Sequence, residues 1–281
     1  MNLKKTARTL LKLPLTLPMR FDFVRLRMVY ELKQHWFSDL GLGIPLTEGF
    51  HCPIPGLDSL CSFSEIFVTG EYGSLLQDIP LPSRWIDLGC HTGYFTLYLA
   101  WQHALAGSEN WRALLIDADP RMEKLANATI RANRLDRQCT ILPGLISRHQ
   151  GGRDFALRQG MGSSSDLEVA GVQEIRRVRT ISPGAILDTF PGPYDLIKVD
   201  IEGGEYDFLE HYVAVYATAT FILLEWHSPD REGSGENHAR DLLTARGFRF
   251  LKTVRSKREL QLEDNWYSSG VQLYQRAGSS A

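Results

Sequence analysis

Few features of this sequence point to structural metals, disulfide bonds or membrane spans. Its 281 residues include only four cysteines, which form no C-x-x-C pair and lack the spacing of a zinc site. Scattered cysteines favour reduced thiols, so we expect a cytoplasmic protein. No apolar run is long enough to cross a bilayer, and no small-residue cleavage site follows a hydrophobic core near the N-terminus. We therefore expect neither a transmembrane segment nor a secretory signal.

The chain also lacks an excess of either charge. Lys and Arg number 31, Asp and Glu number 33, and the formal net charge is -2. Without an overall basic field, nucleic acid is not an expected partner. Hydrophobic residues make up 43% of the sequence, which is enough for a large core. We expect one domain over residues 83–281 and a helical and loop extension over residues 1–82 that packs on it.

The N-terminal extension has three parts. Between residues 3 and 13, lysines and an arginine lie among leucines, which suits either a helix on a membrane surface or, as the alternative, a helix that covers the domain or a frayed chain end. Residues 21–37 predict a second helix. Residues 41–82 are rich in Gly, Pro and Ser and predict a linker, in which Glu71 and Tyr72 either line the pocket of the domain or seal helix ends.

The most informative motif lies at residues 84–100, RWIDLGCHTGYFTLYLA. The short apolar run at 85–88 predicts a strand, the glycines at 89 and 93 predict a turn, and residues 94–100 predict a helix. A glycine turn before a helix lets a ligand approach main-chain N–H groups. We expect a cofactor at this turn.

The spacing of the turn is D-x-G-x-x-x-G. It lacks the third glycine of the G-x-G-x-x-G pattern, which brings the backbone against a dinucleotide pyrophosphate. An acid before the turn suits a ligand with a positive amino group, such as S-adenosylmethionine. The predicted cofactor contacts are Asp87, Gly89, His91 and Gly93. The alternative is an α/β turn that binds no ligand.

The second predicted strand, residues 111–119, ends in two acids. An acid at the tip of the second strand of such a sheet can accept hydrogen bonds from both ribose hydroxyls of an adenosine. We predict Asp117 for this role. Asp119 is the alternative, although its side chain also suits a helix cap. A third strand at residues 138–142 leads to a turn where Leu145 is predicted to lie against adenine.

The next segment is less regular. Residues 153–157 and 176–180 predict two strands, which bracket a glycine and serine run at residues 160–165. That run suits either a substrate loop or a solvated connector. A short helix is predicted at residues 182–190.

Acids gather at the end of the fourth predicted strand, in DLIKVDIEGGEYDFL at residues 195–209. Asp200 ends the strand and faces the crevice where open α/β sheets bind ligands. Glu202, Glu205 and Lys198 crowd the same place, and such charges are costly to desolvate unless they bind something or each other. The alternative is that Glu202 and Glu205 only stabilise a helix start.

A fifth strand at residues 221–224 carries Glu225 and His227 to the same edge of the sheet. Closing strands are predicted at residues 248–254 and 270–274, with a solvated basic loop at residues 255–258 between them.

Taken in order, these motifs resemble those of the FkbM family of methyltransferases. The resemblance covers roughly residues 60–230, and the order of the motifs makes it specific. The matching stretches are DLGCHTGYFT from Asp87, IDADP from Ile116, GSS from Gly162, ILD from Ile186, IKVDIEGGE from Ile197 and LEWH from Leu224.

The resemblance implies an α/β fold of the Rossmann-like class I methyltransferase type, with a seven-stranded, mostly parallel sheet and helices on both faces. It also implies S-adenosylmethionine as methyl donor and usually a hydroxyl oxygen as acceptor, on a small molecule, sugar or glycan. Two departures stand out: Cys90-His91 where the family commonly has alanine-asparagine, and Asp117-Ala118 where it commonly has glutamate-proline. Asp117 keeps the carboxylate, whereas His91 changes the pocket wall and leaves the acceptor class open.

The expected mechanism is in-line methyl transfer, accelerated mostly by alignment and desolvation. The candidate catalytic residues are Asp200, which also borders the cofactor, His227, Lys198 and Glu202. Proton removal falls to Asp200, His227 or His91, or is replaced by a divalent cation held at Asp200. We predict no metal site, because the sequence offers no ligand spacing of its own.

Two other functions use the same elements. An NAD-dependent oxidoreductase shares the sheet, but the missing third glycine counts against it. A catalytically silent nucleotide-binding module is expected to lose the acids at the ends of the fourth and fifth strands, yet Asp200, Glu202 and Glu225 are present.

Overall fold

The described residues of the computed structural model are 42–47, 49–73, 75–158, 163, 172–230, 232–262 and 265–278, together with Met28, Glu31, Leu32 and His35. The basic segment at residues 3–13, most of the helix predicted at 21–37 and most of the glycine and serine run at 160–165 lie outside the described residues.

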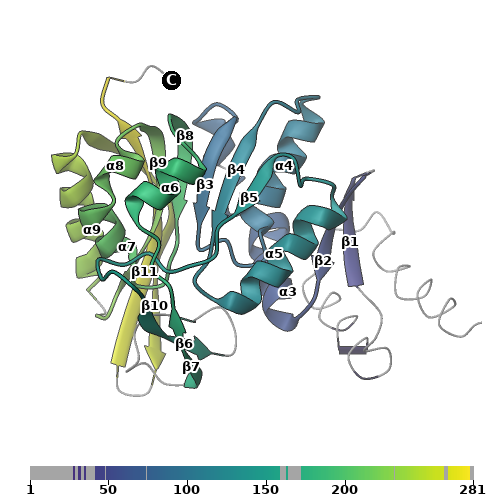
Figure 1. Cartoon of the computed structure of the whole chain (residues 1–281), viewed down its shortest axis with the longest axis horizontal. Helices are drawn as coiled ribbons and strands as arrows, with labels where there is room; N and C mark the ends of the chain where they lie inside the picture. Colours follow the sequence, from purple (N-terminus) through teal and green to yellow (C-terminus); the bar gives the residue numbers. More distant parts are fainter. Residues whose placement is uncertain are drawn as a thin grey trace, which may run out of the picture.

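A seven-stranded sheet forms the centre of the domain (Figure 1). From edge to edge its strands are β10 (Phe248–Leu262), β11 (Asn265–Arg276), β9 (Ala219–Ser228), β8 (Tyr194–Val199), β3 (Arg84–Leu88), β4 (Arg112–Ile116) and β5 (Cys139–Ile141). Neighbouring strands from β9 to β5 are parallel, whereas β11 is antiparallel to both β9 and β10. The predicted seven-stranded, mostly parallel Rossmann-like sheet is confirmed.

The strand order reverses between β3 and β8. After β3 the chain builds outward through β4 and β5, and it then returns to place β8 on the other side of β3. Asp200 N donates to Leu88 O at 3.1 Å, so the two strand ends remain joined. In open α/β sheets, ligands bind at the carboxyl ends of the strands beside such a reversal. This point of the sheet therefore positions the candidate site.

Helices cover both faces of the sheet (Figure 1). One face packs against α3 (Leu57–Phe63), α4 (Tyr94–Leu105) and α5 (Pro120–Ala132), and the other against α6 (Pro183–Thr189), α7 (Glu205–His211), α8 (Val213–Tyr216) and α9 (Ser234–Ala245). The buried side chains between the sheet and α3, α4 and α5 form a first core cluster, and those between the sheet and α6 to α9 form a second. Because side chains alternate along a strand, Trp85 lies in the first cluster and Ile86 in the second. Both faces of such a strand are buried, so its sequence is a continuous run of apolar residues.

The described part of the N-terminal extension includes a hairpin that the sequence did not predict. Strands β1 (Leu42–Thr47) and β2 (Phe50–Ile54) are antiparallel and contribute Ile44, Cys52 and Ile54 to the first core cluster. A π-helix (Ser64–Val68) and a 3-10 helix (Leu75–Gln77) follow α3. Prolines at 45 and 53 hid the strands, because proline is depleted in strands except at edges. The domain boundary at residue 82 stays a prediction.

A second small sheet pairs β6 (Arg153–Arg158) with β7 (Val172–Val178) in antiparallel register. The sequence predicted both strands, although β7 begins and ends earlier than expected. The basic loop predicted at residues 255–258 is wrong, because these residues belong to β10. The polar run suggested solvent, but the Arg255 side chain is largely buried against two glutamates.

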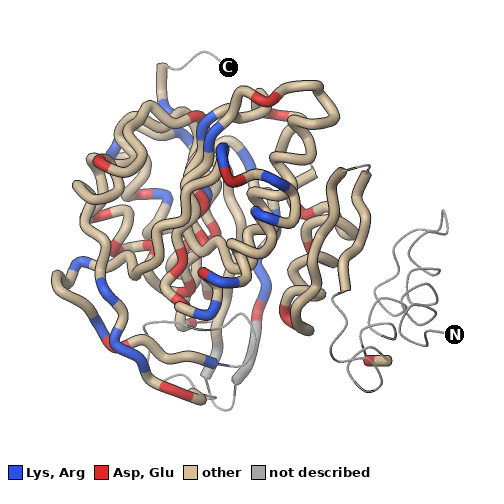
Figure 2. The backbone as a smooth tube through the Cα atoms, turned by 45° about the vertical axis from the view of Figure 1, so that its right-hand side comes forward, with Lys and Arg blue, Asp and Glu red and all other residues tan. Residues whose placement is uncertain are grey.

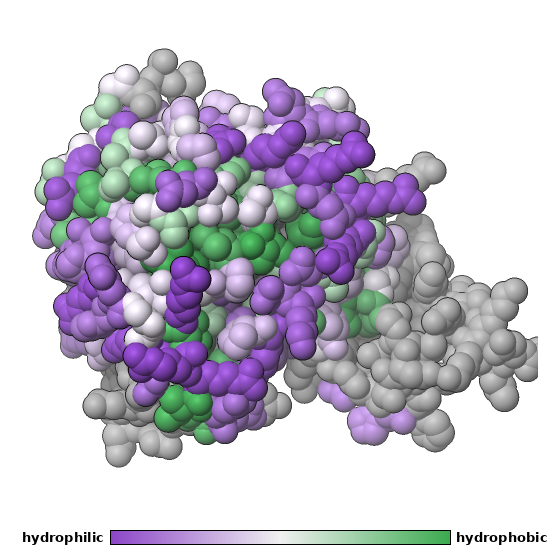
Figure 3. All heavy atoms as spheres, viewed as in Figure 1, coloured by the Kyte–Doolittle hydropathy of each residue, from purple (hydrophilic) through white to green (hydrophobic). Residues whose placement is uncertain are grey.

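Two views show the outer surface and the distribution of charge. Figure 2 shows several acidic positions close together in the middle of the molecule, in addition to those at the surface. Figure 3 shows a hydrophobic area within a largely hydrophilic face, which is ordinary for a folded domain of this composition. None of the helices in the described ranges has the length and hydrophobicity that a membrane span requires.

Candidate active site

The loop between β3 and α4 turns through three residues with positive φ: Gly89 at 72°, His91 at 49° and Gly93 at 79°. At Gly89 a close approach also requires glycine, because an added Cβ would lie 1.5 Å from the backbone oxygen of Asp200. The Asp200 backbone occupies the side of Gly89 where a Cβ would lie, so glycine at this position lets the ends of β3 and β8 come together. The predicted contact between Gly89 and the cofactor stays a prediction.

Asp87 lies fully buried at the end of β3. Its Oδ2 accepts a hydrogen bond from Thr96 Oγ1 at 2.9 Å, whereas its Oδ1 lies 3.7 Å from Lys198 Nζ and has no hydrogen-bond partner among the described residues. Burial raises the pKa of the Asp87 carboxyl, although the Lys198 ammonium opposes the shift. A buried acceptor without a donor costs free energy. A cofactor ammonium, acting directly or through water, fits this need.

Asp117 directly follows β4, and its two carboxylate oxygens accept hydrogen bonds from two different turns. Oδ2 accepts from His91 N at 2.7 Å, and Oδ1 accepts from Asp119 N at 2.8 Å. Burial raises the pKa of Asp117 to about 7 in spite of these two hydrogen bonds. Each oxygen keeps a further lone pair, so the carboxylate fits a pair of ribose hydroxyls.

Asp119, the alternative to Asp117, is already engaged. It caps α5, where its Oδ1 accepts from Arg121 N at 2.9 Å. The Arg121 guanidinium also pairs with Asp119 Oδ2 at 2.5 Å. This geometry supports Asp117 as the carboxylate that remains available to a ligand.

Two further predicted cofactor contacts are Leu145 and His91. Leu145 is buried with Phe155 and Leu157, and Ala118 at the end of β4 packs against this group. The His91 ring places Nδ1 3.4 Å from the Thr92 hydroxyl oxygen. Burial lowers the pKa of His91, which favours a neutral imidazole.

Lys198 connects the ends of β3 and β8. Its Nζ donates to Asp200 Oδ2 at 2.9 Å and to Gly89 O at 3.3 Å. Burial by itself would lower the pKa of Lys198, but the carboxylates of Asp200 and Asp87 raise it well above its ordinary value. Burial would likewise raise the pKa of Asp200, and the charges of Lys198 and His227 hold it below its ordinary value. An ionised pair at this position satisfies both buried groups.

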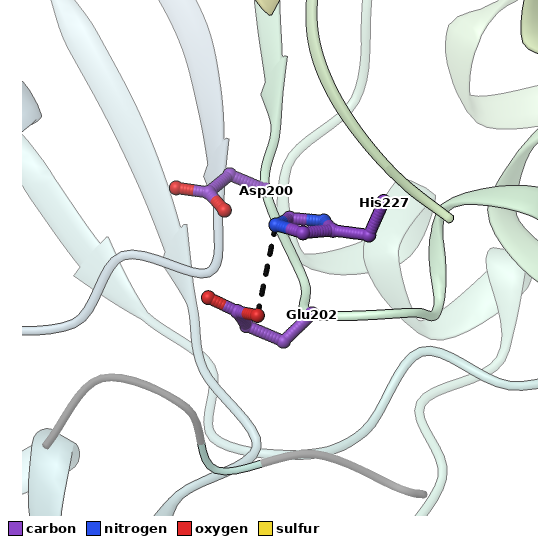
Figure 4. Close-up of side chains that lie close together, drawn as sticks. All are labelled: Asp200, Glu202 and His227. Atoms are coloured by element: carbon purple, nitrogen blue, oxygen red, sulfur yellow. Dashed lines mark ion pairs between the residues drawn. The ribbon is translucent and has the colours of Figure 1, made fainter. Parts of the chain in front are cut away.

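Three predicted catalytic side chains converge beside this pair. Asp200 and Glu202 follow β8, and His227 lies near the end of β9 (Figure 4). One candidate ligand atom from each of the three lies within 4.8 Å of the others. Glu202 has a φ of 51°, which is uncommon for a residue other than glycine. Burial raises the pKa of Glu202 to about 7, although the charge of His227 opposes the shift.

Glu205 holds the His227 ring in place. Its fully buried carboxylate lies 2.9 Å from His227 Nδ1, and it accepts hydrogen bonds from the backbone N–H groups of Ile201 at 3.2 Å and Gly203 at 3.0 Å. Burial alone would lower the pKa of His227, but Glu202 and Glu205 raise it well above its ordinary value. With Nδ1 engaged, Nε2 points toward the other acids.

Arg255 forms ion pairs with two glutamates beside this cluster. Arg255 donates from Nε to Glu71 Oε1 at 2.7 Å and also pairs with Glu225. Glu71 is therefore linked to Glu225 by the guanidinium of Arg255. Tyr72 packs edge-on against Phe95, with ring centroids 4.9 Å apart. Burial raises the pKa of Glu225 to about 7, with Arg255 opposing the shift.

Sequence reasoning gave no role to Arg255, and it left the roles of Glu205 and Glu71 undecided. The position of Glu205 could have indicated its role, because an acid at the start of a helix beside the ligand crevice can contact a site residue as well as stabilise the helix. For Arg255 the sequence carried no such signal, because its partners lie 184 and 30 residues away.

Comparison with known proteins identifies the family. The model of the family described as Methyltransferase FkbM domain matches residues 87–250. No curated protein matches the chain.

Solved structures with a similar chain path have low sequence identity. An O-methyltransferase from Bacillus cereus in complex with SAH is 13% identical, with 88% of this chain and 96% of that chain covered and a TM-score of 0.47. A putative O-methyltransferase from Klebsiella pneumoniae is 13% identical, with 74% and 79% covered and a TM-score of 0.42. A precorrin-6y C5,15-methyltransferase from Geobacter metallireducens GS-15 is 12% identical, with 75% and 88% covered and a TM-score of 0.43.

The family match spans more than half of the 281 residues and includes the β3–α4 loop, Asp117 and the cluster at the ends of β8 and β9. The orphaned oxygen of Asp87 and the available lone pairs of Asp117 fit the ammonium and the ribose of S-adenosylmethionine. The chain belongs to the FkbM methyltransferase domain family, and its cofactor is S-adenosylmethionine.

Proposed function

We propose that this methyltransferase acts on a hydroxyl oxygen of a small molecule, a sugar or a glycan. The observation that carries the proposal is the convergence of Asp200, Glu202 and His227 within 4.8 Å beside the β3–α4 loop. A hydroxyl is a poor nucleophile until its proton is withdrawn, and general bases supply this help. A cluster of carboxylates and an imidazole next to the cofactor loop suits that task.

We propose that one set of residues holds the cofactor. Its members border the ends of β3 and β4: Asp87, Gly89, His91, Gly93, Asp117 and Leu145, with Asp200 at the boundary with the acceptor. S-adenosylmethionine, when bound, supplies an electrophilic methyl group on a sulfonium. Asp117 would accept the ribose hydroxyls, and the Asp87 carboxylate would balance the ammonium. These contacts fix the direction from which an acceptor approaches.

A second set of residues is proposed to act on the acceptor. Asp200 lies nearest to the cofactor loop, since its backbone contacts both Leu88 and Gly89. Its carboxylate would orient the hydroxyl and receive the proton, while Lys198 keeps the carboxylate in place at 2.9 Å. Glu202 and His227 complete the wall of this site. The acceptor oxygen would gain a bond to the methyl carbon while the bond from that carbon to the sulfonium sulfur breaks, which leaves a neutral thioether, and the hydroxyl proton would pass to Asp200.

Calorimetry and a labelled transfer assay together test this function. The purified chain should bind S-adenosylmethionine and show no saturable binding of NAD. With a deuterated methyl donor and a panel of acceptors that carry hydroxyl, amine or thiol groups, the label should appear on oxygen. Binding of NAD alone, or label only on nitrogen, sulfur or carbon, would contradict the proposal.

We further propose that the protein works in the cytoplasm on a free acceptor and not on nucleic acid. Balanced charge and scattered cysteines support this location and partner class. The basic segment at residues 3–13 lies outside the described residues, and its contact with a membrane surface stays a prediction.

A further inference from the structure

The acids at the ends of β8 and β9 exceed the cations beside them. Lys198 is shared by Asp87 and Asp200, and Arg255 is shared by Glu71 and Glu225. Glu202 and the fully buried Glu205 have ion pairs only with His227 among the described residues. Even with a protonated imidazole, these two carboxylates share one positive charge. Excess negative charge in a half-buried site is stabilised by a bound cation.

The orientation of His227 is a second observation, and it points to metal ligation. Its Nδ1 is bound by Glu205 at 2.9 Å, while its Nε2 lies 3.6 Å from both Glu202 Oε2 and Glu225 Oε1. A separation of 3.6 Å is too long for a hydrogen bond. A histidine that binds a metal almost always gives its other ring N–H to a carboxylate or carbonyl. The Glu205–His227 contact has this form.

The spacing of the donor atoms suits one ion. Ligand atoms from Asp200, Glu202 and His227 lie within 4.8 Å of one another. Figure 4 shows the three side chains close together, with the Glu202 carboxylate facing the imidazole ring. Two ligands on opposite sides of a divalent cation, each about 2.1 Å away, lie about 4.2 Å apart. Small side-chain rotations therefore bring all three donors to bonding distance. The Asp200 and Glu202 side chains are 25% and 37% exposed, which leaves them room to move.

We propose that Asp200, Glu202 and the Nε2 atom of His227 bind one divalent cation, with Glu205 as a positioning residue. Because Asp200 Oδ2 accepts a hydrogen bond from Lys198 Nζ, Asp200 would bind the ion through Oδ1. One imidazole and two carboxylates suit Mn²⁺, Fe²⁺ or Zn²⁺ better than Ca²⁺, which prefers oxygen ligands throughout. The sequence predicted no metal site, because its ligands come from two separate strand ends.

The role of the cation rests on the proposed function. Three protein donors leave coordination positions for the hydroxyl oxygen of an acceptor. Coordination lowers the pKa of that hydroxyl, so its proton leaves to solvent and its lone pair becomes available for the bond to the methyl carbon. With the cation bound, Asp200 and His227 would serve as ligands, and release of the proton to solvent would take the place of the proton transfer to Asp200 described above for the cation-free site.

Direct binding of Mn²⁺ tests the site without any need for an acceptor. The full chain, freed of metal with a chelator and then dialysed, is titrated with Mn²⁺ while the signal of free Mn²⁺ is followed by electron paramagnetic resonance. We expect one saturable site per chain. His227→Ala and Glu202→Gln should each weaken binding by about tenfold or more. Glu205→Ala should also weaken it, and Glu205→Gln, which keeps an acceptor for Nδ1–H, should restore part of the affinity.

The matched control is Glu210→Gln on α7. Glu210 is a surface acid whose Oε2 lies 3.7 Å from His211 Nε2 and whose Oε1 lies 3.6 Å from His238 Nε2. It is therefore a carboxylate beside imidazoles that lies outside the proposed site. This variant should bind Mn²⁺ as the wild type does. The proposal is overturned if the wild type shows no saturable site, or if His227→Ala and Glu202→Gln bind Mn²⁺ as tightly as the control.

Calorimetry with S-adenosylmethionine on the same samples separates this proposal from the proposed function. Unchanged cofactor affinity in His227→Ala shows that the variant is folded, so a loss of Mn²⁺ binding is then assigned to the missing ligand. If the wild type binds S-adenosylmethionine but shows no Mn²⁺ site, only the proposed cation site is overturned. Mn²⁺ binding without cofactor binding contradicts the proposed function instead.

Discussion

Glu205 Oε1 lies 2.9 Å from His227 Nδ1, and this contact joins the start of α7 to the end of β9. The same carboxylate accepts backbone N–H groups from Ile201 and Gly203, so one side chain holds both the turn after β8 and the imidazole. The acids that follow β8 and the histidine on β9 thus form one unit.

Removal of that carboxylate should destabilise the protein. Glu205→Ala leaves two backbone donors and the partly buried His227 imidazole without their acceptor, so we expect the free energy of unfolding to fall by roughly 3–5 kcal/mol. Glu205→Gln should cost less, because its amide oxygen still accepts one hydrogen bond. Urea unfolding of the two variants and the wild type measures both effects. An alanine variant as stable as the glutamine variant would contradict the role assigned to this contact.

Asp117→Ala should weaken S-adenosylmethionine binding at least about tenfold, because two charge-assisted hydrogen bonds contribute on the order of 1.5–3 kcal/mol. Asp119→Ala is the matched comparison. It removes the cap of α5 and should lower stability by about 1 kcal/mol with a smaller effect on cofactor affinity. Calorimetry and thermal unfolding on both variants decide the assignment. If Asp119→Ala loses cofactor binding and Asp117→Ala does not, Asp119 and not Asp117 binds the ribose.

Cofactor affinity should also depend on pH through Asp117. Burial raises the pKa of this carboxyl to about 7 in the cofactor-free protein. Only the ionised form accepts hydrogen bonds from both hydroxyls, so affinity should rise from pH 6 to pH 8 and then level off. In Asp117→Asn this rise should be absent, while any titration of the cofactor itself remains. Identical pH profiles for the two proteins would show that Asp117 does not meet the ribose.

Gly89→Ala should prevent correct folding of the site, since the added Cβ would meet the Asp200 backbone oxygen at 1.5 Å. Gly93→Ala is the milder change. Its Cβ would lie 3.3 Å from a Leu115 methyl group, although φ at 79° still disfavours a side chain. Expression, circular dichroism and calorimetry should therefore show a larger loss for Gly89→Ala. Equal behaviour of the two variants would mean that the ends of β3 and β8 separate easily.

Much of this arrangement could be predicted because parallel strands have a fixed direction. Their carboxyl ends meet at one edge of the sheet, so Asp87, Asp117, Asp200 and His227 are placed near each other once their strands are recognised. The apolar runs of β3, β4 and β8 made those strands visible.

Features that depend on long-range register could not be predicted. Arg255 meets Glu71 and Glu225 only because β10 continues beyond Val254, with bulges that alter its pairing with β11. The role of Gly89 required knowledge of where Asp200 lies. The β1–β2 hairpin carries prolines that weaken any strand signal, and packing against α3 and α5 supplies what local propensity lacks.

The central claim is tested most directly by labelled methyl transfer in the wild type and in Asp200→Asn, with a deuterated methyl donor, hydroxyl-bearing acceptors and detection by mass spectrometry. Asp200→Asn keeps the shape of the side chain but removes the charge that pairs with Lys198 at 2.9 Å. We predict label on an acceptor oxygen with the wild type, turnover lower by roughly 10²–10⁴-fold in Asp200→Asn, and cofactor affinity within a few-fold of the wild type. Label on another atom, or equal turnover in the two proteins, would contradict the account.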